Sequence, residues 1–167
     1  MKEKNKKIIC YHLDGTPQEV NISELRFRPS VYGLLIKDGK ILLSKQWDGY
    51  DFPGGGIDID ETIDQALERE FWEETGIKVK KDKLVSCESR FFIGIFSKKP
   101  FNSILMYYLC QKVGGQLSKD NFAGNEKDYL DMPEWINLKD IDKIKFYNSV
   151  DSPAIINKAF NILNKNE

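Results

Sequence analysis

The segment Gly55–Ile77 constrains this chain more than any other, because a glycine-rich loop leads directly into a strongly acidic stretch with helical periodicity. Thr62 belongs to a residue type that caps helix N-termini, and Gln65 three residues later completes a capping box. Gly76 stands where a residue in the left-handed conformation would end the helix. The segment therefore predicts a helix over Ile63–Thr75.

The predicted helix carries carboxylates on its apolar face. At about 100° per residue, Ile63, Leu67 and Phe71 share one stripe along the helix. Glu70 and Glu74 fall inside the same arc, between the apolar side chains. A carboxylate that faces a protein core is costly unless it is paired with a cation or bound to a metal ion.

The charge balance of the segment favours a metal ion as that partner. Between Asp58 and Glu74 the chain has eight acidic residues and one basic residue, Arg69. Arg69 can reach Glu73, one helical turn away, but at this spacing we expect it not to reach Glu70 or Glu74. A solvated acidic surface is the alternative, and the position of the carboxylates within the apolar stripe argues against it. We therefore expect a divalent cation site.

The available ligand types predict Mg²⁺ rather than Zn²⁺ or Ca²⁺. Carboxylate and backbone oxygens suit hard cations. His12 is the only histidine, and the three cysteines are too scattered in the sequence for a zinc site. Asp58 and Asp60 suggest a calcium-binding loop, but its sixth position is Ile63, where such a loop requires glycine.

The same segment resembles the Nudix box, whose pattern is Gly-x5-Glu-x7-Arg-Glu-apolar-x-Glu-Glu-x-Gly-apolar. Every specified position is matched, and the matching residues are Gly55, Glu61, Arg69, Glu70, Phe71, Glu73, Glu74, Gly76 and Ile77. The flanking sequence from about Arg28 to the C-terminus is also similar to this family. The resemblance implies an α/β protein, an α/β/α sandwich with a mixed sheet, that hydrolyses nucleoside diphosphates linked to another moiety.

The resemblance also implies how the site is built. The expected ligands of Mg²⁺, for which Mn²⁺ can substitute, are Glu70, Glu74, Glu73 and the backbone carbonyl of Gly55. The candidate catalytic residues are Glu73, Glu126, Glu61 and Arg69. Glu126, in the acidic loop that follows Gly124, is the preferred general base. Glu61 is a second candidate base or a brace for the loop, and Arg69 is expected to be a structural partner of Glu73 or the loop rather than a phosphate ligand.

Substrate contacts are expected outside the box. An aromatic side chain can stack on a nucleobase, and an arginine can bind a phosphate. The leading candidates are Arg28, Trp47, Tyr50 and Phe52, and the further candidates are Tyr32, Phe91, Phe96, Arg26 and Arg90. Each aromatic residue can equally belong to the hydrophobic core.

Hydrophobic patterning and turn residues predict the remaining elements. Ile8–Leu13 and Glu19–Ile22 flank Asp14-Gly15, a strong hairpin signal, so residues 1–25 are expected to be a hairpin extension before a domain over residues 26–167. This hairpin can serve dimerisation or cover a sheet edge. The predicted strands are Val31–Ile36, Ile41–Trp47, Leu84–Ile95, Ile104–Val113 and Glu134–Asn137. A last helix is predicted over Ser152–Leu163, capped by Ser152 with Pro153 at its first position.

Composition narrows the possible partners. The net charge of −1 gives no general attraction to a nucleic-acid polymer or an acidic membrane. The sequence has no apolar run of membrane-spanning length and no segment that resembles a signal peptide. Three scattered cysteines are typical of a reducing compartment, so a cytoplasmic protein that acts on a small nucleotide, with homodimerisation possible, is expected.

Three functions remain open. The first is a Mg²⁺-dependent pyrophosphohydrolase that cleaves a nucleoside triphosphate or a nucleoside diphosphate derivative by attack of water on phosphorus. The second is an isopentenyl-diphosphate isomerase, which needs a set of metal-binding histidines that a chain with one histidine cannot provide. The third is a nucleotide sensor without catalysis, which usually lacks carboxylates of the box, whereas all are present here. The hydrolase is favoured.

Overall fold

The computed structural model describes residues 6–165. Its strands are β1 (Lys7–Tyr11), β2 (Pro17–Asn21), β3 (Arg26–Phe27), β4 (Ser30–Leu34), β5 (Ile36–Lys37), β6 (Lys40–Gln46), β7 (Gly49–Asp51), β8 (Gly54–Gly56), β9 (Ile77–Ile93), β10 (Pro100–Gly115) and β11 (Leu130–Asn137). Within this range a seven-stranded mixed sheet has the order β2-β1-β9-β10-β4-β8, with β3 paired to β10. A four-stranded antiparallel sheet consists of β11-β6-β5, with β7 paired to β6.

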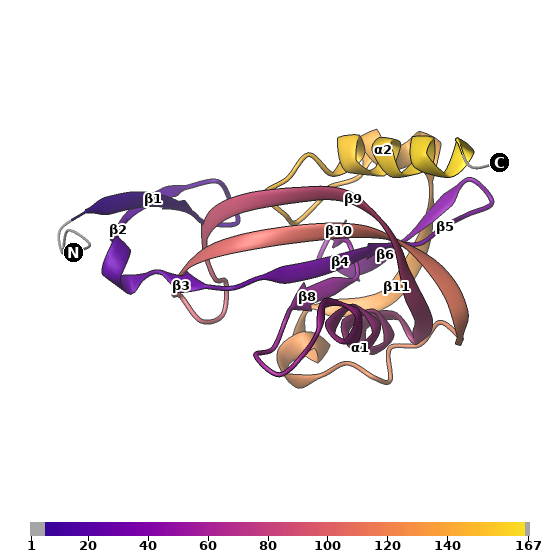
Figure 1. Cartoon of the computed structure of the whole chain (residues 1–167), viewed down its shortest axis with the longest axis horizontal. Coiled ribbons are helices and arrows are strands. Elements are labelled where there is room, and N and C mark those ends of the chain that lie inside the picture. Colours follow the sequence, from indigo (N-terminus) through magenta and orange to yellow (C-terminus); the bar gives the residue numbers. More distant parts are fainter. Residues whose placement is uncertain (1–5, 166–167) are drawn as a thin grey trace.

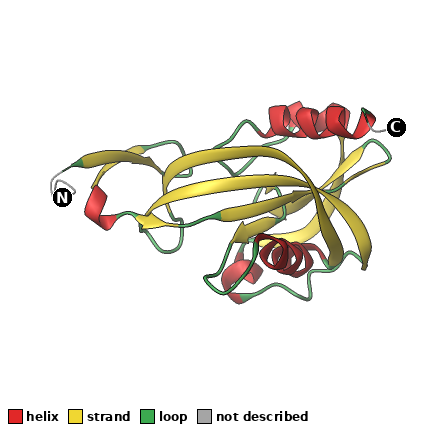
Figure 2. Cartoon of the chain, in the orientation of Figure 1, coloured by secondary structure: helices red, strands yellow, loops and turns green. Residues whose placement is uncertain are grey.

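Two α-helices lie on opposite sides of the strands (Figures 1 and 2). They are α1 (Ile63–Thr75) and α2 (Ser152–Asn164), and the short 3₁₀ helices are η1 (Ile22–Glu24), η2 (Gly124–Asp128) and η3 (Leu138–Lys143). One hydrophobic core contains Ile156 of α2 together with Leu109 of β10, and a second contains Phe71 of α1 together with Val31 of β4. This arrangement confirms the predicted α/β/α sandwich with a mixed sheet.

Helix α1 has the bounds that its sequence predicts. The Thr62 side chain accepts a hydrogen bond from the backbone N–H of Gln65, and Gly76 ends the helix in the left-handed conformation with φ 72°. A Cβ atom on Gly33 of β4 would lie 2.6 Å from Cδ2 of Phe71, so only glycine allows the helix to approach the strand this closely. The close approach places the acidic face of α1 beside β8.

The N-terminal hairpin continues the main sheet. Strands β1 and β2 are antiparallel around Gly15, whose φ is 82°. Tyr11 pairs in parallel with Phe92 of β9, so the hairpin covers this edge of the sheet. Figure 1 shows it extending from the body of the molecule at the end opposite to the C-terminus. The division of the chain between residues 25 and 26 stays a prediction.

Several expected boundaries are wrong. Strand β9 begins at Ile77 rather than Leu84, because buried Ile77 and Val79 alternate with exposed lysines and so continue the strand pattern directly after the helix. The N-cap of α2 is Asp151 rather than Ser152, since the carboxylate of Asp151 accepts a hydrogen bond from the N–H of Ala154. Over residues 6–165, no helix combines the length and the apolar character that crossing a membrane would require.

Candidate active site

Glu70 and Glu74 lie on the inner face of α1, as the helical spacing predicts. Their exposed fractions are 9% and 8%, in the range of core residues. The buried neighbours on the same helix face are Ala66, Leu67 and Phe71. The helix therefore holds two carboxylates in a largely apolar environment.

Three carboxylates from two elements form a cluster. Glu70 and Glu73 come from α1, and Glu126 comes from η2; one oxygen from each lies within 4.8 Å of the other two. Glu126 is held in place because its Oε2 accepts a hydrogen bond of 2.7 Å from the N–H of Ala123. The fold thus brings the acidic loop predicted to supply a base to the acidic helix.

Glu74 lies on the same inner face of α1, one turn beyond Glu70, and is not one of the three residues of this cluster. Its Oε2 accepts a hydrogen bond of 2.5 Å from Ser44 Oγ of β6 and a longer one of 3.4 Å from the N–H of Gly54. The side chain of Glu74 therefore lies between its own helix, α1, and strands β6 and β8, next to the glycine loop.

Burial changes the proton affinity of these groups. Loss of solvent raises the pKa of Glu70 to about 7, although the positive charge of Arg69 opposes the change. Burial raises the pKa of Glu74 well above its ordinary value, against the opposing hydrogen bond from Ser44. It also raises the pKa of Glu126. A bound cation would offset the cost of keeping these carboxylates ionised.

Arg69 connects the helix to the loop in front of it. Its Nε lies 2.6 Å from Glu61 Oε1, and its Nη2 donates to Glu61 Oε2 at 2.7 Å and to the carbonyl of Gly56 at 3.2 Å. Its Nη1 lies 3.3 Å from Glu73 and 2.9 Å from Glu70. The expectation that Arg69 does not reach Glu70 is wrong, because the long side chain bends back toward the loop and reaches its sequence neighbour.

Gly55 provides close backbone contact at the cluster. It pairs with Val31 in the sheet, and a Cβ atom at this position would lie 2.6 Å from Oε1 of Glu70. Any other residue would displace that carboxylate. Carboxylates and a nearby backbone carbonyl form an all-oxygen set of donors, which fits Mg²⁺ or Mn²⁺ and not Zn²⁺.

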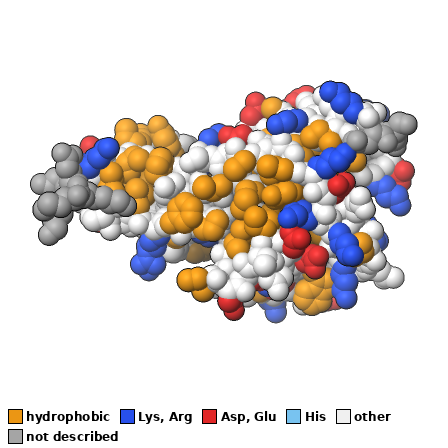
Figure 3. All heavy atoms as spheres, viewed as in Figure 1, with side chains coloured by type: hydrophobic (Ala, Val, Ile, Leu, Met, Phe, Trp, Pro, Cys, Tyr) orange, Lys and Arg blue, Asp and Glu red, His pale blue; other side chains and the backbone are white. Residues whose placement is uncertain are grey.

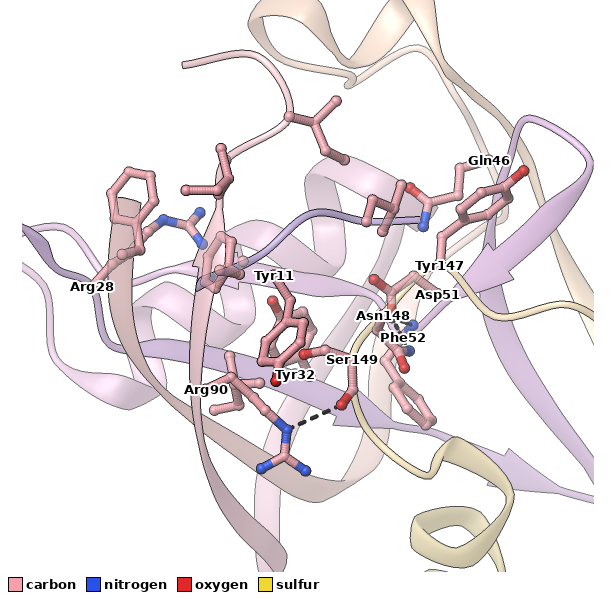
Figure 4. Close-up of a pocket in the computed structure, with 18 of the residues that line it drawn as sticks. Tyr11, Arg28, Tyr32, Gln46, Asp51, Phe52, Arg90, Tyr147, Asn148 and Ser149 are labelled. Atoms are coloured by element: carbon pink, nitrogen blue, oxygen red, sulfur yellow. Dashed lines mark hydrogen bonds between the residues drawn. The ribbon is translucent and has the colours of Figure 1, made fainter. Parts of the chain in front are cut away.

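A cavity of about 890 Å³ extends from the glycine loop, and Figure 4 shows many of its residues. Gly55 and Glu74 are among the residues that line it. The sequence-predicted candidates that line it are Arg28, Trp47, Phe52, Tyr32, Phe91, Phe96 and Arg90. Tyr50 does not line it, because its hydroxyl points to Glu134 and donates a hydrogen bond of 2.8 Å.

The sequence interpretation missed a polar group in this cavity. Asp51 accepts hydrogen bonds from Asn148 Nδ2 at 2.8 Å and from the N–H of Phe52 at 2.7 Å. Burial raises the pKa of Asp51 to about 7. In Figure 4, Asp51 and Asn148 lie together with Gln46 and Tyr147 nearby. The signal that could have identified Asp51 is its place in the sequence, as an acidic residue directly before Phe52 and the glycine loop.

Aromatic rings surround Trp47 at this part of the cavity. The ring of Trp47 lies 4.8 Å from that of Tyr147 and 5.4 Å from that of Tyr129, measured between centroids. Trp47 has a φ of 48°, which is uncommon for a large side chain, and its side chain is 43% exposed. This conformation belongs to the tight turn between β6 and β7, and the turn places Trp47 in the cavity lining.

Comparison with known proteins agrees with this geometry. The model of the NUDIX domain family matches residues 26–156, and the chain therefore belongs to the Nudix family of MutT-like hydrolases. A MutT-like protein of Streptomyces ambofaciens is 31% identical over 102 residues, which cover 59% of this chain and 60% of that protein. An 8-oxo-dGTP diphosphatase of Buchnera aphidicola is 26% identical over 131 residues, covering 74% of this chain and 85% of that protein.

The fold is also similar to solved structures. An ADP-ribose pyrophosphatase of Streptococcus suis superimposes with a TM-score of 0.59 at 18% sequence identity, covering 80% of this chain and 91% of that chain. The chain spans only 60% and 38% of the lengths of the first two curated relatives that it matches. The match to the family model over residues 26–156 thus establishes family membership. The structural similarity establishes the fold.

Proposed function

We propose that this protein is a Mg²⁺-dependent hydrolase that cleaves a phosphoanhydride bond in a nucleotide derivative by attack of water on phosphorus. The observation that carries the proposal is the cluster of Glu70, Glu73 and Glu126 beside the cavity that Gly55 and Glu74 help to line. A diphosphate is anionic, so it cannot approach these carboxylates unless a cation lies between them.

The residues that would hold the cation are Glu70, Glu73 and Glu74, with the carbonyl of Gly55. Mn²⁺ would fit the same oxygen donors. When bound, such a cation neutralises charge on the diphosphate and lowers the pKa of a coordinated water. Gly55 leaves room for Glu70 because it has no side chain.

Glu126 is our candidate for the general base. It comes from η2, outside the helix, so it can approach a water from a side that Glu70 and Glu73 do not occupy. Burial raises its pKa, which makes it a better proton acceptor than an exposed glutamate. Glu61 is engaged by Arg69 through two short contacts, which favours the role of loop brace for Glu61 and a positioning role for Arg69.

Arg28 is our candidate for binding a phosphate of the substrate. Its Nη1 donates to Ser30 Oγ at 3.1 Å, and its guanidinium lies against Gly56 of the loop. Over residues 6–165 it has no carboxylate partner within ion-pair distance, so its charge is available to an anion. The side chains of Trp47 and Phe52, in the cavity wall, are the candidates for contact with a base.

Two of the similar proteins and the net charge of −1 support a small nucleotide as the substrate, whereas other relatives are RNA pyrophosphohydrolases that match 36–38% of this chain. The named relatives act on 8-oxo-dGTP and ADP-ribose, which are small nucleotides. We infer a nucleoside triphosphate or a nucleoside diphosphate linked to another moiety as the substrate here, not a nucleic-acid polymer. We also infer a cytoplasmic location, since Cys10, Cys87 and Cys110 are all free thiols.

A product screen tests this proposal. The purified chain is incubated with Mg²⁺ or with EDTA and with nucleoside triphosphates, nucleotide sugars, ADP-ribose and dinucleoside polyphosphates. Released phosphate is measured after added pyrophosphatase for the triphosphates, and after added alkaline phosphatase, which attacks the terminal phosphates of the products, for the other compounds. We expect turnover of at least one compound that requires the cation and is lost in Glu73→Gln. The exposed variant Glu68→Gln on the same helix serves as control and should keep full activity. Tight binding without turnover would instead identify a nucleotide sensor.

A further inference from the structure

The N-terminal hairpin has two apolar faces, and only one of them is packed. Cys10 and Val20 are buried with Ile93 of β9 in a small core. Because side chains alternate along a strand, Ile9 and Tyr11 point to the opposite side. Both are 50% exposed. An apolar face left open on a two-stranded extension is unfavourable unless something covers it.

The open face lines the same cavity as the glycine loop. Ile9, Tyr11 and Leu13 all contribute to the cavity that Gly55 and Glu74 line at another point. Figure 4 draws Tyr11 among the side chains that line this cavity, together with Tyr32, Arg28 and Ser149. Figure 3 shows hydrophobic side chains exposed over the hairpin end of the molecule. The open face is therefore part of the cavity wall.

Neighbouring strands extend this apolar wall. Phe92, which pairs with Tyr11, and Phe101 of β10 also line the cavity, and their rings stack with centroids 5.4 Å apart. Arg28 lines the same cavity, and its guanidinium lies against Gly56. The cavity thus has an anion-binding region near Arg28, with an aromatic and aliphatic region beyond it.

The two regions fit a substrate with two organic ends. A nucleoside triphosphate has one organic end and would leave the apolar region at Ile9 and Tyr11 without an apolar partner. A diphosphate that joins a nucleoside to a second ring-bearing group places apolar surface there instead. The hairpin itself lies outside residues 26–156, the range that the family model matches.

We propose that the inner face of the N-terminal hairpin, formed by Ile9, Tyr11 and Leu13, determines substrate specificity by holding a ring-bearing group attached to the far side of the diphosphate. The inference rests on the proposed function, because it assumes that the diphosphate lies between Arg28 and the carboxylate cluster. Tyr11 is the central contact, since its ring can stack on a flat group.

Equilibrium binding with Ca²⁺ in place of Mg²⁺, under conditions where chromatography shows the ligands intact, tests the hairpin separately from catalysis, because Ca²⁺ is a hard cation that accepts the same oxygen donors. The ligands are ADP, ADP-ribose and reduced nicotinamide adenine dinucleotide, which share one nucleoside diphosphate and differ in the second end. We expect the dinucleotide to bind the wild-type chain about tenfold more tightly than ADP, the gain typical of one aromatic stack. In Tyr11→Ala and Leu13→Ala this gain should shrink to about twofold or less, while the affinity for ADP is unchanged.

A matched control separates the wall from the stability of the hairpin. Lys7→Ala removes an exposed side chain of the same strand that does not line the cavity, and it should keep the full gain. Equal affinity of the wild type for all three ligands, or no binding of any, would overturn the inference. An equal loss for ADP and the dinucleotide in Tyr11→Ala would also overturn it. If the chain hydrolyses none of the nucleotides but the binding results are as expected, the proposed function is contradicted. The role of the hairpin in binding is then still supported.

Discussion

Arg69 Nε lies 2.6 Å from Glu61 Oε1, and this contact joins α1 to the loop that precedes it. The same guanidinium contacts Glu73 on the helix and the carbonyl of Gly56 in the loop. One side chain thus fixes the position of the glycine loop relative to the carboxylates of the helix. Its contacts to Glu61 are bidentate, the geometry that gives an arginine its greatest effect.

Replacement of this arginine should therefore affect both stability and activity. We expect Arg69→Gln to lower the free energy of unfolding by about 1–3 kcal/mol, because Glu61 and Glu73 lose a partly buried partner. Activity should fall more than the stability loss explains, since the loop is no longer held. Urea denaturation and steady-state kinetics measure the two effects. The control Lys81→Ala breaks an ion pair with Asp64 on the same helix and should cost about 1 kcal/mol or less. Equal effects in both variants would contradict the bracing role.

The burial of ionised Glu70 and Glu74 should lower the stability of the protein when no cation is bound. Binding of a cation at these carboxylates should raise its stability. We expect Glu70→Gln and Glu74→Gln to unfold at the same or higher temperature than wild type in EDTA, because each removes a carboxylate that is costly to bury. Mg²⁺ should raise the Tm of the wild type through binding to the folded state and should not raise the Tm of these variants. Differential scanning calorimetry measures both. Glu68→Gln, an exposed change on the same helix, should keep the shift. An equal shift in all four proteins would count against the site.

Glu126 should contribute mainly to the chemical step. If Glu126 removes a proton from the attacking water, Glu126→Gln should lower kcat by roughly 10²–10⁴, with a small change in KM. The control is Asp128→Asn, which changes an exposed residue of the same 3₁₀ helix. Kinetics at several Mg²⁺ concentrations distinguish a base from a ligand, since loss of a ligand raises the Mg²⁺ concentration needed for half-maximal activity. An unchanged kcat would place the base elsewhere, and Glu61→Gln would be the next test.

Asp51 should make stability depend on pH. Its pKa in the folded protein is raised to about 7 by burial, whereas an unfolded aspartate has a pKa of about 3.9. Between these values the folded state binds the extra proton, so its contribution to stability is present at low pH and lost as the pH rises from about 4 to about 7. Asp51→Asn should reduce this decline by the contribution of one proton, at most about 1.4 kcal/mol per pH unit, while Glu70, Glu74 and Glu126, whose pKa values burial also raises, keep the remainder. Urea denaturation at pH 5 and pH 8 measures it. Asp38→Asn, in an exposed turn, should show the wild-type dependence, and a wild-type decline in Asp51→Asn would contradict the assignment.

Local interactions explain why the sequence alone predicted α1 so well. The cap at Thr62, the left-handed Gly76 and the apolar periodicity all act within one segment, so no distant contact is needed to locate the helix. The burial of Glu70 and Glu74 follows from the same periodicity. The position of Glu126 near Glu70 and Glu73 was expected only from the family resemblance, because no local pattern links residues so far apart.

The cavity depends on contacts that the sequence does not display. Asp51 and Asn148 meet across 97 positions, and Tyr11 meets Phe92 through a single parallel pairing of strands. Tyr50 and Phe52 are aromatic residues of the same short segment, so the sequence gives both as candidates for substrate contact. Alternation along β7 turns Tyr50 toward Glu134 and away from the cavity. Such positions are set by the register between strands, which hydrophobic pattern alone does not determine.

Hydrolysis in water enriched in ¹⁸O tests the central claim most directly. The wild-type chain is incubated with Mg²⁺ and a nucleoside diphosphate derivative that it cleaves, and the products are analysed by mass spectrometry. If water attacks phosphorus at the carboxylate cluster, the label appears in a phosphate group of one product, and Glu73→Gln releases no labelled product. Label found only outside phosphate, or labelled phosphate released equally by Glu73→Gln, would contradict the account.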